Sequence, residues 1–188
     1  MIYQIRQKQL RRQSKNRGDK QQLGDVPSRV LTKLKEANQD QRDKDEPLVV
    51  LSHSMGGQIV YDLVTYFMPE IPAYKNLRID FWCASASQVG LFEELKLFRA
   101  SNDQYGKQHN NQVPLPDRRY LGGWWNVWDH NDFISYSAKN IIADVDDQDY
   151  NSGMSVIQAH RGYVERPSFF RAFAEKLRLA KNQNWGRP

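Results

Sequence analysis

The sequence has a single cysteine, so Cys83 has no partner for an internal disulfide. It lies in an apolar run, which favours a core residue over a nucleophile. Long apolar runs are also missing: no stretch reaches the roughly 18 to 20 residues of a membrane-spanning helix, and the N-terminus has no signal-peptide core. We therefore expect a cytoplasmic protein.

Clusters of metal-binding residues are also missing from the sequence. His130 and Asp132 are close together, but no other residue approaches the spacing of zinc ligands. We therefore expect no bound metal, and no motif calls for a cofactor.

The net charge of +5 is concentrated near the N-terminus. Residues 1–46 hold 12 of the 27 Lys and Arg and 7 of the 22 Asp and Glu, and the remainder is neutral. Residues 1–24 are basic and polar with few aromatics, which favours a flexible extension over a nucleic-acid-binding arm. A helix with apolar residues at Val26, Val30, Leu34 and Ala37 is expected next, inside a domain spanning 25–188.

One segment, LVVLSHSMGGQIV at residues 48–60, changes its periodicity at a serine. The run 48–51 is typical of a strand buried in a parallel sheet, and the residues that follow have helical spacing up to Pro69. Ser54 lies at the junction, with the small residues Ser52 and Gly56 two positions away on either side. Small flanking residues allow a strained strand-to-helix turn that presents a serine hydroxyl.

This segment resembles the nucleophile elbow of the α/β-hydrolase fold, with Ser52 where the family usually has glycine. The resemblance implies an α/β fold: a three-layer sandwich with a mostly parallel sheet. It also implies that Ser54 is the nucleophile and that the Met55 backbone N–H holds the oxyanion. It covers about residues 25–180 and matches only the later half of the family fold.

The family order of nucleophile, acid and base predicts a histidine late in the chain. His160 precedes a helical pattern that opens near Pro167, as the family's base does. His53, inside the elbow, is interpreted as structural, and His109 as a loop residue.

The acid is expected at the end of the aromatic run at residues 124–134. Asp132 is preferred because it precedes the apolar pair Phe133 and Ile134, as in the family. Asp129 is interpreted as a turn residue but stays an alternative, and Asp144 is a more distant one.

Further strands are predicted at residues 77–84 and 124–129, with a fourth possible at 141–145, and a helix at 93–98. Candidate residues for a substrate pocket are His53, Ser85, Ser87 and Tyr163. Polar residues between about 100 and 120 predict a lid or a surface loop.

The expected function is hydrolysis of an ester or related acyl bond in a small-molecule or lipid-like substrate, through Ser54, His160 and Asp132. The family's earlier strands, and its second oxyanion donor, have no counterpart in residues 1–46. An inactive truncated remnant and an interaction module are therefore kept as alternatives. The strand before Ser54 would then be an open sheet edge, which favours self-association.

Overall fold

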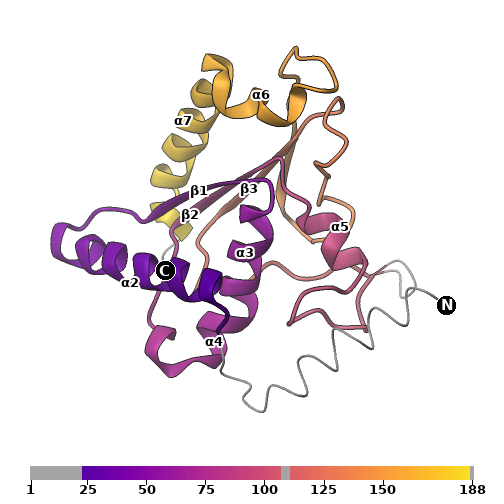
Figure 1. Cartoon of the computed structure of the whole chain (residues 1–188). Helices are drawn as coiled ribbons and strands as arrows, with labels where there is room; N and C mark the ends of the chain where they lie inside the picture. Colours follow the sequence, from indigo (N-terminus) through magenta and orange to yellow (C-terminus); the bar gives the residue numbers. More distant parts are fainter. Residues whose placement is uncertain (1–22, 107–110, 187–188) are drawn as a thin grey trace.

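The computed structural model describes residues 23–106 and 111–186. Its centre is a four-stranded sheet in which every strand is parallel to its neighbours (Figure 1). The strands lie in chain order: β1 (Val49–His53), β2 (Phe81–Ser85), β3 (Trp124–Trp128) and β4 (Asp146–Asp149). All carboxyl ends therefore lie at one edge of the sheet, where open parallel sheets place their functional residues.

Helical elements cover both faces of this sheet, so the chain has an α/β fold (Figure 1). They are α2 (Asp25–Lys44), α3 (Gly56–Asp62), the π-helical turn η1 (Leu63–Phe67), α4 (Met68–Glu70), η2 (Pro72–Tyr74), α5 (Val89–Glu94), α6 (Ala159–Glu165), α7 (Pro167–Asn182) and η4 (Asn184–Gly186). The elements from α2 to α5 pack on one face, and α6 and α7 on the other. No helix in the described residues is both long and apolar enough to cross a membrane.

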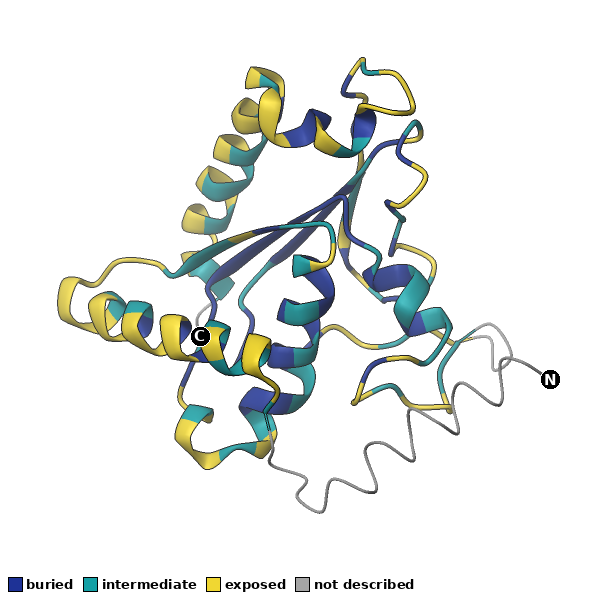
Figure 2. Ribbon diagram, in the orientation of Figure 1, coloured by how far each residue is buried: buried dark blue, intermediate teal, exposed yellow. Residues whose placement is uncertain are grey.

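The aromatic run of β3 supplies both cores because successive strand residues point to opposite faces. Trp124 stacks on Trp82 at a centroid distance of 4.8 Å on the α3 face. Trp125 lies on the α7 face, against Phe169 and Phe173. Figure 2 shows that β2 and β3 are the most buried part of the fold. This explains why bulky side chains occupy successive positions at the start of β3.

Replacing Trp125 by alanine is expected to lower the free energy of unfolding by about 3–5 kcal/mol. The side chain is fully buried, and its ring centroid lies 5.8 Å from that of Phe169 and 6.2 Å from that of Phe173. Urea unfolding followed by far-UV circular dichroism measures the loss. Leu179→Ala, at an exposed position on α7, is the control and should stay within about 0.5 kcal/mol of the wild type. Equal effects at the two positions would contradict this account of the core.

The strands expected at 48–52, 77–84 and 124–129 correspond to β1, β2 and β3, although β2 begins only at Phe81. The fourth was expected at 141–145 and is wrong by several residues, because β4 is Asp146–Asp149. Three of its four residues are aspartates, which strands disfavour. Tertiary contacts override this preference: the Asp147 carboxylate accepts hydrogen bonds from the side chains of Asn126, Trp128 and Ser137 and from the Ala138 N–H.

The helix expected before β1 is present as α2, but its predicted apolar face is partly wrong. Leu31 and Leu34 are buried, whereas Val26 is exposed. The helix expected at 93–98 is α5, which begins at Val89 and ends at Glu94. Residues 1–22, most of the basic extension, and His109 lie outside the described residues.

The helix after Ser54 was expected to end at Pro69, but it continues to Glu70. Pro69 has no N–H to donate to the preceding turn. The chain accommodates it after a π-helical turn, in which the Met68 N–H bonds to the Leu63 carbonyl five residues back. Such a turn adds one residue and lets Leu63 and Met68 both be fully buried.

Among the described residues, β1 has only β2 as a neighbouring strand. Val49 and Val50 are half-buried and Leu51 is exposed, so this edge is apolar and uncharged. Self-association through this edge stays a prediction. Sedimentation velocity should show an average mass that rises with protein concentration, and Leu51→Lys should reduce that rise. A single 22.0 kDa species at all concentrations would contradict it.

Candidate active site

Ser54 immediately follows β1 and has a backbone φ of 54°. Positive φ is strained in a residue with a side chain, by roughly 1–3 kcal/mol. Hydrogen bonds hold the turn in this shape: the Ser54 N–H donates to the Ser85 carbonyl at 2.9 Å, and the Gly57 N–H donates to the Ser54 carbonyl at 2.9 Å. The turn leaves Ser54 partly exposed at the carboxyl end of the sheet.

The glycines after Ser54 differ in how tightly they are packed. A Cβ on Gly57 would lie 2.6 Å from the Ser87 Cβ, which is a severe clash, whereas one on Gly56 would lie 3.4 Å from the Ser52 Cβ. The close approach between helix and sheet therefore depends most on Gly57, which the small residues at positions 52 and 56 did not indicate. Ser52 is more than a small residue, because its Oγ accepts the Trp82 indole N–H at 2.8 Å.

The structure brings Ser54, His160 and Asp132 together, although they are widely separated in the sequence. The Ser54 Oγ lies 2.9 Å from the His160 Nε2, and the His160 Nδ1 lies 2.9 Å from the Asp132 Oδ2. A carboxylate can only accept, so Nδ1 carries the proton and Nε2 is free to accept from the serine hydroxyl. The arrangement can deprotonate Ser54 when it attacks an electrophile.

His160 is the second residue of α6, a short helix that precedes the helical pattern expected near Pro167. The placement on a short helix fixes its backbone more firmly than a loop would. Gly162 is needed in this helix because a Cβ there would lie 2.8 Å from the Ser152 Cβ. α6 is therefore packed directly on the segment that follows β4.

Asp132 is almost completely buried and has several donors. Its Oδ1 accepts the Ile134 N–H at 3.1 Å, and its Oδ2 lies 3.3 Å from the Tyr163 hydroxyl in addition to His160. Buried ionised carboxylates need such donors. Burial raises the pKa of Tyr163 above its ordinary value, and the neighbouring carboxylates raise it further, so this phenol stays protonated.

The alternative acids have other contacts. Asp129 is buried, and its carboxylate accepts the N–H groups of Asn131 at 2.9 Å and Ser152 at 2.8 Å. It thus closes the turn after β3 and fastens the segment after β4. Asp144 is exposed in the turn before β4. Among the described residues, neither carboxylate is hydrogen-bonded to the His160 ring.

Three of the pocket candidates, Ser85, Ser87 and Tyr163, are buried close to the three residues. Ser85 and Ser87 are fully buried; the Ser85 hydroxyl donates to the Ser52 carbonyl, and the Ser87 hydroxyl donates to Asn126. Tyr163 is also fully buried, beneath Asp132. These three residues support the site from behind and do not line a substrate pocket. Met55 is exposed beside Ser54.

His53, the last residue of β1, contacts His160. Its Nδ1 lies 3.1 Å from the Ser85 Oγ, and its ring centroid lies 4.9 Å from that of His160. The Ser85 hydroxyl also donates to the Ser52 carbonyl at 3.0 Å. Burial, and secondly the proximity of His160, lower the pKa of His53, while Asp132 acts in the opposite direction.

The lowered pKa of His53 predicts a pH dependence of stability. The unfolded chain binds a proton at His53 at a higher pH than the folded chain, so stability falls as the pH drops below about 6.5. His53→Gln should reduce this slope, by less than the roughly 1.4 kcal/mol per pH unit that one proton gives. Urea unfolding of both proteins between pH 7.5 and 5 measures it. An equal pH dependence of the unfolding free energy in the two proteins would contradict its assignment to His53.

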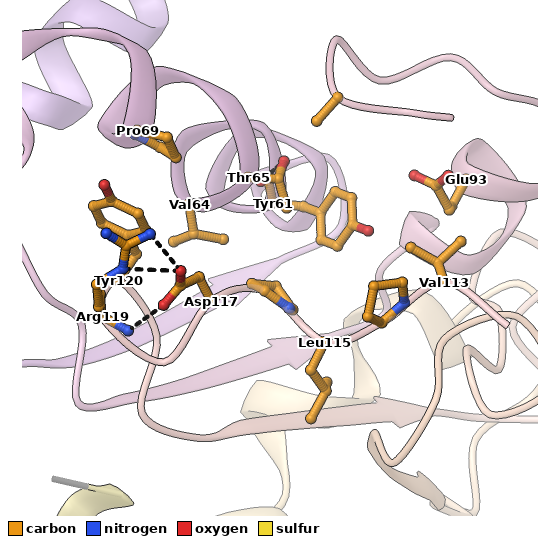
Figure 3. Close-up of a pocket in the computed structure, with 13 residues that line it drawn as sticks. Tyr61, Val64, Thr65, Pro69, Glu93, Val113, Leu115, Asp117, Arg119 and Tyr120 are labelled. Carbon is orange, nitrogen blue, oxygen red and sulfur yellow. Dashed lines mark hydrogen bonds and ion pairs between the residues drawn. The ribbon is translucent and has the colours of Figure 1, made fainter. Parts of the chain in front are cut away.

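A pocket of about 250 Å³ lies elsewhere, between α3 with its π-helical continuation and the segment 113–120 (Figure 3). Tyr61 and Glu93 line one part of it, and Asp117 and Arg119 lie at another. Its lining residues do not include Ser54, His160 or Asp132. The segment that was expected to form a lid or a surface loop thus contributes residues to this pocket.

Comparison of the chain with known protein families, with characterised proteins and with solved structures finds no match. The candidate site therefore depends on the geometry of this chain's own residues.

Proposed function

We propose that the chain is a serine hydrolase of α/β-hydrolase type that cleaves an ester or related acyl bond. One observation carries the proposal: the hydrogen-bonded series Ser54 Oγ, His160 Nε2, His160 Nδ1, Asp132 Oδ2, with both distances 2.9 Å. The positive φ of Ser54 on a strand-to-helix turn supports it, since strained backbone clusters at functional sites.

In the proposed reaction, the Ser54 Oγ attacks the carbonyl carbon while its proton passes to the His160 Nε2. The oxygen of the tetrahedral intermediate takes a hydrogen bond from the Met55 N–H. His160 then gives its proton to the departing alcohol, which leaves an acyl group on Ser54. Water, deprotonated by His160, attacks this ester, and His160 returns the proton to the Ser54 Oγ as the acid leaves. Asp132 stabilises the imidazolium without taking its proton.

A second candidate, a non-catalytic interaction protein, is favoured by the position of β1. Because β1 has one neighbouring strand among the described residues, no described strand beyond it offers a second oxyanion donor. Removal of one such donor typically lowers turnover by about 10²–10³-fold. Weak hydrolysis is therefore compatible with the proposed function, and its complete absence would favour the second candidate.

The test is hydrolysis of p-nitrophenyl acetate by the wild type and by Ser54→Ala at equal concentration. The proposal expects turnover above the buffer rate for the wild type alone, with repeated cycles beyond one equivalent of product. Equal rates for the two proteins would overturn it. Circular dichroism of the Ser54→Ala protein controls for folding. Ser54 is partly exposed, so its replacement removes no contact in the core.

A further inference from the structure

Exposed apolar side chains are concentrated near the three proposed catalytic residues. Of the twelve large apolar residues that are exposed in the described part of the chain, seven lie within four positions of Ser54, Asp132 or His160 in the sequence. The most prominent are Met55 at 67%, Phe133 at 74% and Ile157 at 92% exposure. Burial in the core cannot explain these side chains, and exposed apolar side chains gathered at one site are typical of a binding surface.

The segments that carry these residues also lack charge. Residues 52–61, 131–138 and 151–160 contain one charged side chain, that of the buried Asp132, although 26% of the whole chain is charged. Arg161, the exposed residue after His160, is the first exception. A site for an anionic or cationic substrate would instead place fixed charges or paired polar groups beside the nucleophile.

Topology brings the three segments to the same end of the molecule. They lie at the carboxyl ends of β1, β3 and β4, which are parallel strands. The Ser54–His160 and His160–Asp132 hydrogen bonds join them directly. In Figure 1 the segment after β3 and the segment before α6 lie on the same side, at the top of the view. Figure 2 shows exposed residues along both.

We infer that the substrate of this site is an uncharged ester with an aliphatic acyl chain of medium length, held against Met55, Phe133 and Ile157. The inference depends on the proposed function, because the acyl carbonyl must lie at Ser54. Met55, Phe133 and Ile157 are strongly exposed and lie within three positions of Ser54, Asp132 and His160 in the sequence, so they are available to contact such a chain. Covering them removes apolar surface from water and favours binding in proportion to chain length.

The test compares three p-nitrophenyl esters below the concentration at which they aggregate: acetate, octanoate, and the mono-ester of suberic acid. The suberate ester has an acyl chain of the same length as octanoate but ends in a carboxylate. We expect kcat/KM for octanoate to exceed that for acetate by at least about tenfold, after correction for spontaneous hydrolysis. The suberate ester should lose most of this gain.

Variants identify the surface that causes the preference. Phe133→Gln and Ile157→Gln should each lower the octanoate-to-acetate ratio at least about threefold. Both positions are exposed, so folding is not at risk. Leu179→Gln, also exposed but on α7, should leave the ratio unchanged.

The two proposals fail in different ways. Hydrolysis of acetate that depends on Ser54, without a preference for octanoate or with equal use of the suberate ester, would overturn the inference and leave the proposed function standing. No Ser54-dependent hydrolysis of any ester would overturn the proposed function and the inference with it.

Discussion

Replacement of His160 by glutamine is expected to lower kcat/KM for ester hydrolysis by at least about 10⁴-fold. Its Nε2 is 2.9 Å from the Ser54 Oγ and is the only base in contact with that hydroxyl among the described residues. Glutamine has no basic nitrogen, so it cannot take the serine proton. Steady-state hydrolysis of p-nitrophenyl acetate, with circular dichroism to verify folding, measures the loss.

His53→Gln is the matched control for this experiment. His53 lies beside His160 and its Nδ1 is hydrogen-bonded to the Ser85 Oγ, so it contacts the base and not the nucleophile. Its replacement should cost less than about tenfold in kcat/KM. If His53→Gln were as damaging as His160→Gln, or if both variants kept wild-type activity, His160 would not be the base.

The second large effect is expected at Asp132. Asp132→Asn should lower kcat/KM by about 10³–10⁴-fold. An asparagine NH₂ group facing the His160 Nδ1 can donate a hydrogen bond to it. This favours the histidine tautomer with hydrogen on Nε2. That tautomer cannot accept the proton of Ser54. The same ester assay measures the effect, and the retained volume of the side chain limits any change in packing.

Asp129→Asn distinguishes the two candidate acids. Its carboxylate accepts the N–H groups of Asn131 and Ser152, and an asparagine can satisfy only one of them. We expect a loss of about 1–3 kcal/mol in the free energy of unfolding, and less than a tenfold change in kcat/KM. The reverse pattern, with activity lost at Asp129 and kept at Asp132, would show that the acid has been misassigned.

The local signals of this sequence predict much of the fold. The change of period at Ser54 places the end of β1 and the start of α3, because buried parallel strands and amphipathic helices have distinct patterns. The aromatic run at 124–128 predicts β3 for the same reason. The family order of residues suggests His160 and Asp132, and the geometry brings them to Ser54.

The features that could not be predicted depend on contacts between distant segments. β4 forms from Asp146–Asp149 because Asp147 accepts donors from β3 and from the turn at Ser137. Nothing in the local sequence indicates these partners. The support of Asp132 by Tyr163 is likewise a tertiary contact, as is the close approach of Gly57 to Ser87. Spacing along one strand or helix contains no information on such pairs.

The most direct test of the proposed function is the site of reaction with a fluorophosphonate probe. The purified chain is treated with the probe, digested, and analysed by mass spectrometry beside Ser54→Ala and heat-denatured protein. An adduct on the Ser54 peptide, absent from both controls, is the predicted result and would show a folded chain with an activated serine. No adduct on native protein, or an adduct on another serine, would contradict the account.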